Sequence, residues 1–171
     1  MGQELSLAAI ILLIMLFISM MFDLRRYEVP AVLTLTSLFG AVAFGLWQGL
    51  WSPVLLIVSL SHIADFNPRQ KRLAFSAVTV AFCGIFQPAT TLVSLAIYAI
   101  WLFWEFELMG GADAKLLMAA LLVFGNIAVV VPVAIAGGVL GILAGLRSQR
   151  QIPYVPAIFS GTALFWAYQF I

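Results

Sequence analysis

The sequence predicts an all-α, polytopic integral membrane protein, a helix bundle with six to eight transmembrane helices. Its composition is 64% hydrophobic and 9% charged, with a mean hydropathy of +1.14, so it has too few polar residues to cover a water-soluble globule of 171 residues. The apolar runs also lack the alternation of membrane strands, so the backbone must satisfy its hydrogen bonds as helices. We expect one transmembrane domain over residues 1–171 and no soluble domain.

The first span is predicted over residues 5–22, an uncharged run long enough for most of a bilayer crossing at about 1.5 Å per residue. No basic segment precedes this run, and Asp-Leu-Arg-Arg follows it in place of a small-residue cleavage site, so we expect a retained span and not a secretory signal. Pro30 then favours a helix start, and residues 31–50 form the second span, ending near Trp47 and Trp51 at the membrane interface.

The middle of the chain leaves the number of spans open. Residues 53–64 and 73–86 are apolar but short, and residues 65–72 between them form the most polar segment. The two runs are therefore either tilted spans or an interfacial hairpin that does not cross. Residues 89–104 form the next span under both alternatives.

The last third of the chain contains three further apolar runs. Residues 116–124 end at a Gly125-Asn126 turn, residues 127–146 form a clear span, and residues 155–171 form the last one after the polar segment 147–153. Gly137, Gly141 and Gly145 recur every four residues, which predicts a face for close helix packing.

The placement of charge predicts the orientation in the membrane. If the spans alternate, every Lys and Arg falls on one side of the bilayer, with six spans as well as with eight. The positive-inside rule makes that side cytoplasmic, which places the chain in the plasma membrane with both termini outside. Asp23 and Asp113 then share the cytoplasmic membrane edge.

Composition also limits the partners and cofactors. A net charge of +1 without a basic, aromatic-rich patch predicts no nucleic-acid partner. The single cysteine, Cys83, excludes an intramolecular disulfide and a Cys-x-x-Cys zinc site, and we expect no metal and no cofactor. The oligomeric state is left open.

The polar segment at 109–115, Met-Gly-Gly-Ala-Asp-Ala-Lys, is the strongest functional signal. Ionisable residues near membrane depth are costly, and Asp23 matches Asp113 in depth. Two neighbouring carboxylates cannot both ionise cheaply, so the pair titrates as a unit and can activate water against an amide. We expect Gly110 and Gly111 to supply unusual backbone dihedrals where the helix of Lys115 begins, and to let the backbone come near an extended substrate.

Other interpretations of the two aspartates remain open at this point. Each can simply cap a helix, as we expect of Asp65, which has no accompanying glycines. In a small multi-pass transporter subunit, Asp23 and Asp113 would bind a cation near the bilayer midplane, and the glycine pair would mark a broken helix. A scaffold of a secretion complex with degenerate acids is a third possibility.

Three separated blocks resemble the type IV prepilin peptidase family. They are Asp23 followed by Pro30, the sequence Gly-Gly-Ala-Asp-Ala-Lys-Leu-Leu at 110–117, and Ile-Pro-Tyr-Val-Pro-Ala-Ile at 152–158 followed by Gly161. The resemblance implies a membrane aspartic peptidase that removes the basic leader of prepilins or preflagellins on the cytoplasmic side. It also implies that Asp23 and Asp113 are catalytic, with motif support from Pro30, Gly110, Gly111, Lys115, Pro153 and Pro156.

Details of the sequence distinguish the chain from the presenilin-like peptidases and from the prepilin peptidases that also methylate. Ala112 stands where the Gly-x-Gly-Asp signature has its second glycine, and the presenilin-like group, which shares that signature, has a Tyr-Asp pair and a Pro-Ala-Leu element that this chain lacks. With one cysteine and no soluble insert, the chain resembles the short, peptidase-only kind of Tad-type and archaeal systems, without methyltransferase activity. The expected partners are a prepilin-like membrane protein and the bilayer, with acidic residues meeting the basic leader: Glu28, Asp65, Glu105 and Glu107.

Overall fold

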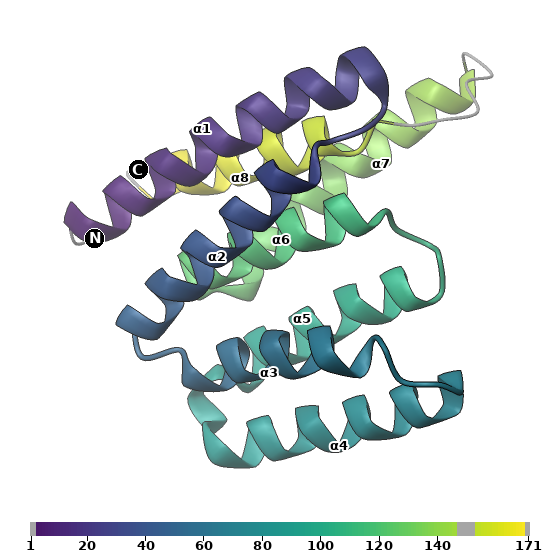
Figure 1. Cartoon of the computed structure of the whole chain (residues 1–171). Helices are drawn as coiled ribbons and strands as arrows, with labels where there is room; N and C mark the ends of the chain where they lie inside the picture. The colour runs from purple at the N-terminus through teal and green to yellow at the C-terminus, as the bar shows by residue number, and fades with distance from the viewer. Residues whose placement is uncertain (1–2, 147–152, 170–171) are drawn as a thin grey trace.

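The computed structural model describes residues 3–146 and 153–169, and within these ranges the chain is helical and contains no strand (Figure 1). The all-α prediction is therefore confirmed for the described residues. The α-helices are α1 (Gln3–Arg26), α2 (Ala31–Trp47), α3 (Trp51–Ile63), α4 (Arg69–Phe86), α5 (Thr91–Glu105), α6 (Gly111–Phe124), α7 (Val130–Leu146) and α8 (Val155–Tyr168), with short 3-10 helices η1 (Pro88–Thr90) and η2 (Ile127–Val129).

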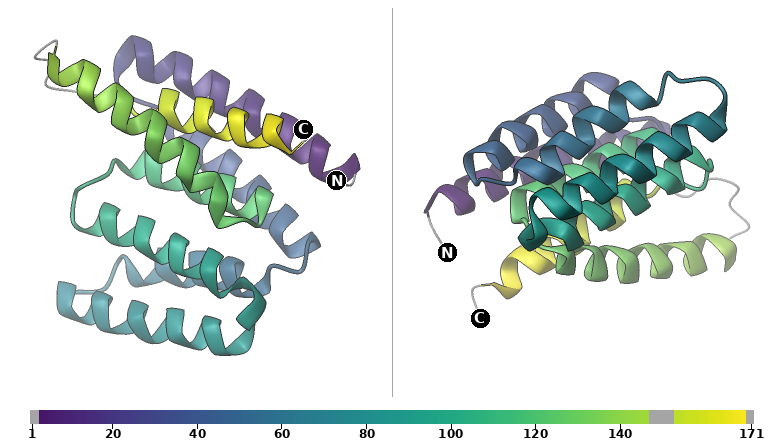
Figure 2. Two further views of the ribbon diagram at one scale, coloured as in Figure 1. Left: turned by 180° about the vertical axis from the view of Figure 1, so that it is seen from behind. Right: turned by 90° about the horizontal axis from the view of Figure 1, so that it is seen from below.

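Successive helices run in opposite directions, so the connections gather at two ends of the bundle (Figures 1 and 2). Loops 27–30, 64–68 and 106–110 lie at one end, here called the polar end, and the start of α1 and the end of α8 lie at the opposite end. This grouping is the one expected from the alternation of spans. The expected polar segment at residues 147–152, with Arg147 and Arg150, lies outside the described residues.

Helix α6 is the central helix of the bundle. Every residue from 116 to 124 is buried, and α6 contacts α1, α2, α5 and α8. A helix that is apolar on all sides is stable when neighbouring helices surround it. It begins after Gly110 and ends at Gly125, whose φ of 57° places it in the left-handed region that often terminates helices. The first turn of this central helix carries Asp113.

The hairpin of α3 and α4 packs beside α5 and α2, on the side of the bundle farthest from α1 and α8 (Figure 1). It runs lengthwise with the other helices and is held by polar contacts at both ends. At the polar end, Arg72 Nη2 lies 2.7 Å from Glu105 Oε1. At the other end, the Gln87 side chain accepts the Ser52 N–H at 3.0 Å and donates to the Gly49 carbonyl at 2.7 Å.

Helices α7 and α8 pack closely through Gly161. A Cβ at Gly161 would lie 2.4 Å from the backbone nitrogen of Val133, so only glycine permits this approach. The expected close packing is found at Gly137, where a Cβ would lie 2.7 Å from the Tyr154 side chain, but not at Gly141, which has no neighbour within 4 Å among the described atoms. The third glycine of the series, Gly145, lies outside the part of the chain whose surroundings are described.

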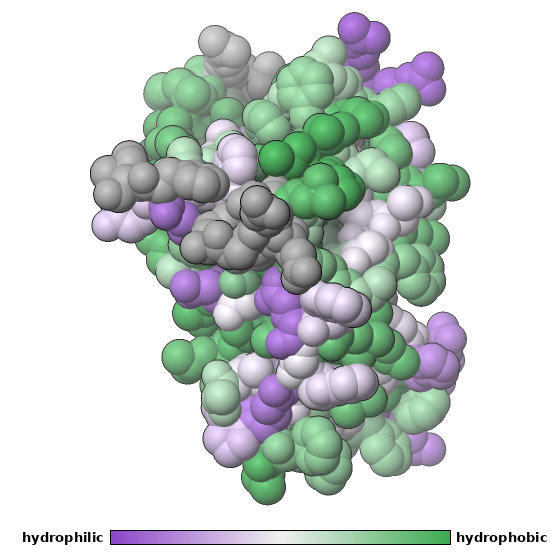
Figure 3. All heavy atoms as spheres, turned by 90° about the vertical axis from the view of Figure 1, so that its left-hand side faces the viewer, coloured by the Kyte–Doolittle hydropathy of each residue, from purple (hydrophilic) through white to green (hydrophobic). Residues whose placement is uncertain are grey.

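Among the described residues, three helical stretches are long and apolar enough to cross a membrane, judged by length and composition: Leu7–Arg26, Pro88–Glu105 and Ile127–Ala144. Large apolar side chains also face outward, and Val32, Ile85 and Leu146 are 73%, 80% and 79% exposed. These outward-facing apolar side chains suit a hydrocarbon solvent. Figure 3 views the bundle from the side that lies on the left in Figure 1, and there hydrophobic side chains are interrupted by separate hydrophilic patches.

Candidate active site

Asp23 lies in the last turn of α1, which continues to Arg26. Tyr27 follows with a φ of 54°, and its N–H donates to the Asp23 carbonyl at 2.9 Å, which closes the helix in a left-handed cap. The Asp23 side chain is only 7% exposed, and its Oδ2 accepts the Val155 N–H at 3.0 Å. Because Val155 is the first residue of α8, whose first N–H groups have no partner within the helix, Asp23 caps α8.

Asp113 is the third residue of α6, and it caps its own helix. Its carboxylate accepts a hydrogen bond from the backbone of Gly110, which is the return bond of a capping box. A Cβ at Gly110 would lie 2.9 Å from Asp113 Oδ2, so glycine leaves the space that the carboxylate occupies. Each of the two aspartates therefore sits at a helix N-terminus.

The expectation of unusual backbone dihedrals at the glycine pair is wrong. Gly110 has a φ of −64° and a ψ of 146°, which other residues adopt readily, and the positive-φ glycines among the described residues are Gly49 and Gly125. Gly111 is needed for space too, since a Cβ there would lie 3.2 Å from Trp104 Nε1. The glycines are constrained by their neighbours and not by their own conformation.

The two carboxylates lie within electrostatic range of each other. Asp113 stands ahead of the apolar part of α6 and outside the candidate spans. Its burial, and then the negative charge of Asp23, raise its pKa to about 6, against the opposing effect of the Gly110 hydrogen bond. Asp65, by contrast, is exposed in a loop. The structure thus brings together Asp23 and Asp113, the two residues that the sequence singled out.

Tyr154 is a third polar group at this site, and the sequence analysis did not single it out. It is the N-cap residue of α8, and its carbonyl accepts the Ala157 N–H at 3.0 Å. Burial and the charge of Asp113 raise the pKa of Tyr154, so its phenol lies within range of that carboxylate. The sequence feature that could have pointed to Tyr154 is its place in the third motif block, residues 152–158, directly before Val155.

The remaining motif residues shape the helix ends around the aspartates. Pro30 is the N-cap residue of α2, and Pro156 lies in the first turn of α8, where a missing N–H costs nothing. Pro153 directly precedes Tyr154. Lys115 is partly buried on α6 and makes no ion pair with any described residue.

One of the acidic residues expected to meet a basic leader is already paired. The Glu105 side chain is 7% exposed and bonds both Arg69 and Arg72 of α4. Glu28, Asp65 and Glu107 remain exposed in the loops of the polar end. These three carboxylates keep that end available to a cationic segment.

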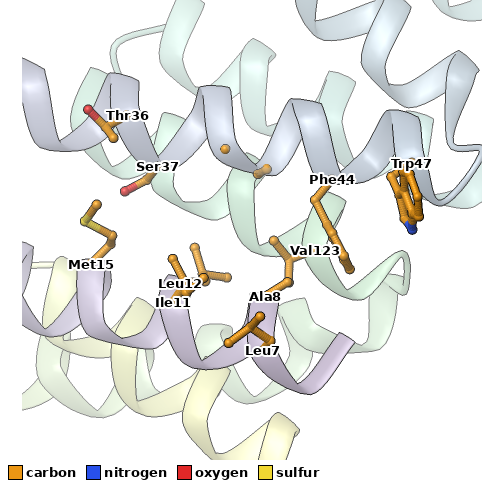
Figure 4. A pocket seen from close by; sticks show the side chains of 12 residues that line it. Leu7, Ala8, Ile11, Leu12, Met15, Thr36, Ser37, Phe44, Trp47 and Val123 are labelled. Carbon is orange, nitrogen blue, oxygen red and sulfur yellow. The ribbon is translucent and has the colours of Figure 1, made fainter. Parts of the chain in front are cut away.

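Two cavities differ in their relation to the aspartates. The larger, of about 550 Å³, lies between α1 and α2 (Figure 4), and its α1 residues extend from Leu7 to Met15, short of Asp23. The smaller, of about 290 Å³, lies between α5, α6 and α7 and includes Met109 and Tyr154 among its lining residues. The smaller cavity therefore borders the candidate site.

Comparison with known proteins gives no relative from which function is transferred. No protein-family model, no curated protein and no solved structure matches this chain.

Proposed function

We propose that this protein is a multi-pass membrane aspartic endopeptidase that removes the basic leader from type IV prepilin-like or preflagellin-like proteins. The observation that carries the proposal is that Asp23 and Asp113, which come from different helices, lie within electrostatic range of each other. Paired carboxylates whose environments separate their proton affinities are the arrangement that general acid–base hydrolysis needs.

The environments of the two carboxylates support a division of roles. Asp113, whose pKa is raised to about 6, is the member assigned to donate a proton, because this pKa lies closer to neutral pH than that of an ordinary aspartate. Asp23 accepts the Val155 N–H at the start of α8, and this bond holds its Oδ2 in place as an acceptor. Asp23 therefore serves as the base and Asp113 as the acid.

In the proposed reaction, Asp23 takes a proton from water while the water oxygen attacks the carbonyl carbon of the scissile bond. Asp113 gives its proton to the carbonyl oxygen, which forms a tetrahedral diol. The C–N bond then breaks, its nitrogen takes the proton held by Asp23, and a hydroxyl proton returns to Asp113. The products are the leader carboxylic acid and a new amino terminus, and both aspartates regain their starting states.

The arrangement of the helices supports a membrane setting with six to eight spans. The helices that fall short of a full span, such as α3 with 13 residues, lie lengthwise in the same bundle as the longer ones. We place the polar end in the cytoplasm because it carries Arg25, Arg26, Arg69, Lys71 and Arg72 in and beside its loops. A substrate with an apolar helix in the bilayer and a basic leader in the cytoplasm then presents its scissile bond at the depth of the aspartates.

A transporter subunit with the two aspartates as cation ligands is the alternative. It predicts acids near the middle of the bundle, at a break in a helix. Asp23 and Asp113 instead lie in the last turn of α1 and the first turn of α6, both at the polar end, and each caps a helix. Their position favours the peptidase.

The proposal is tested with the purified full chain in liposomes and a prepilin that carries a basic leader. The wild-type protein is expected to release the leader, and Asp113→Asn to lower the rate by about 10²–10⁴-fold, the contribution of a general acid. Glu4→Gln, which neutralises a carboxylate in the first turn of α1, at the opposite end of the bundle from the aspartates, is the control and should cleave at the wild-type rate. Equal cleavage by Asp113→Asn and the wild type would refute the proposal.

A further inference from the structure

We propose that Tyr154 is a catalytic residue of the site, and that its phenol donates a hydrogen bond to the oxygen of the scissile carbonyl. The inference rests on the proposed peptidase function and adds a third group to the two carboxylates. No proton leaves the phenol in this role, because it holds the developing negative charge by a hydrogen bond while Asp113 delivers the proton.

The start of α8, at Tyr154 and Val155, interacts with both aspartates. The next residue in the chain, Val155, donates its N–H to Asp23 Oδ2 at 3.0 Å. The phenol of Tyr154 is close enough to Asp113 to feel its charge. The start of α8 therefore contacts one carboxylate through its backbone and reaches toward the other through its side chain.

The Tyr154 ring is held against α7, while its hydroxyl has no hydrogen-bond partner among the described residues. A Cβ at Gly137 would lie 2.7 Å from both the phenol oxygen and Cε2, so the ring end rests on the bare backbone of α7. Among the described residues, no hydrogen-bond partner of the Tyr154 hydroxyl is present. The residue also lines the 290 Å³ apolar cavity between α5, α6 and α7. A clamped residue that lines a cavity and carries a donor without a partner is available to a ligand.

The chemistry of the Tyr154 phenol also suits a hydrogen-bond donor. Burial and the nearby Asp113 charge raise the pKa of Tyr154 above its ordinary value of 10.0, so the phenol stays protonated and is a donor at neutral pH. Donors fixed in advance near a developing oxyanion contribute about 10²–10³-fold in kcat. The close α7–α8 packing at Gly161 also holds α8, which carries this donor at its start, against α7.

Tyr154→Phe tests the inference in the prepilin cleavage assay, because it removes the hydroxyl and keeps the ring on Gly137. We expect kcat to fall about 10²-fold with KM unchanged, as for the loss of an interaction made in the transition state. Tyr98→Phe is the matched control: Tyr98 is likewise partly buried, but it stacks on Trp101 of α5 and receives a bond from Ser76. This control should keep the wild-type kcat.

A second pair of variants moves the phenol without removing it. Gly137→Ala pushes the ring end away from α7, and Gly141→Ala adds the same methyl group in open space on the same helix. We expect lower kcat for Gly137→Ala and wild-type kcat for Gly141→Ala. Wild-type kcat in both Tyr154→Phe and Gly137→Ala would overturn the inference while the peptidase proposal stands. An inactive wild-type protein would overturn the peptidase proposal, and the inference with it.

Discussion

Replacing Asp113 by Asn should stabilise the folded protein at neutral pH and have little effect in acid. The pKa of Asp113 is raised from 3.8 to about 6 in the folded state, chiefly by burial. Below pH 4 this carboxyl is protonated in both the folded and the unfolded chain. As the pH rises from about 4 to 6, the unfolded chain loses the proton and the folded chain retains it, so the folded state loses stability.

The size of the effect follows from the difference between the two pKa values. A difference of about 2 pKa units at 1.36 kcal/mol each gives a destabilisation of about 3 kcal/mol above pH 7. This value is an upper limit because Asp113 is only partly buried and solvent screens its charge. Asn removes this titration but keeps an oxygen that accepts the Gly110 hydrogen bond. For a chain of this length the gain corresponds to a rise in Tm of roughly 6–12 °C.

The assay is thermal unfolding of the detergent-solubilised protein between pH 4 and pH 8. The Tm difference between Asp113→Asn and the wild type should grow across this range, whereas Asp65→Asn should show no such growth. In an Asp23→Asn background the gain should shrink but persist, because burial contributes more than the Asp23 charge. A Tm difference independent of pH, or a gain unaffected by Asp23→Asn, would refute the account of the pair.

Two further predictions concern the packing that supports the site. Gly161→Ala places a methyl group 2.4 Å from the Val133 backbone nitrogen and should lower the unfolding free energy, measured by chemical denaturation, by about 1–3 kcal/mol. Gly138→Ala adds a methyl group in open space on α7 and should cause no such loss. A Gly161→Ala variant as stable as the wild type would contradict the α7–α8 contact. Gln87→Ala leaves the Ser52 N–H and the Gly49 carbonyl without their partner and should lower the unfolding free energy by about 1–3 kcal/mol in the same experiment. Gln70→Ala, which changes an exposed glutamine, should leave the unfolding free energy unchanged.

The helical architecture and the grouping of polar loops were predictable because they depend on local patterns. Uncharged runs, Pro30 and Gly125 mark the helix limits, and the alternation of runs places loops 27–30, 64–68 and 106–110 at one end. The central position of α6 was not predictable, since residues 116–124 have the same apolar composition whether lipid or protein surrounds them.

The aspartate pair was predictable as a pair, but its supporting contacts were not. Asp23 and Asp113 stand out because charged residues are rare in this chain. The partner of Asp23 is the backbone N–H of Val155, and a backbone group leaves no trace in residue identity. Similarly, the need for glycine at 110 and 111 comes from Asp113 and Trp104 nearby in space, so spacing alone suggested the wrong reasons.

The most direct test of the central claim is cleavage of a basic-leader prepilin by the purified protein in ¹⁸O-labelled water, followed by mass spectrometry of the released leader. The account predicts one ¹⁸O atom in the new carboxyl group of the leader, and leader release slowed by at least about 10²-fold in Asp23→Asn and in Asp113→Asn. Leader release by either variant at the wild-type rate, or an intact prepilin after incubation with the wild-type protein, would contradict it.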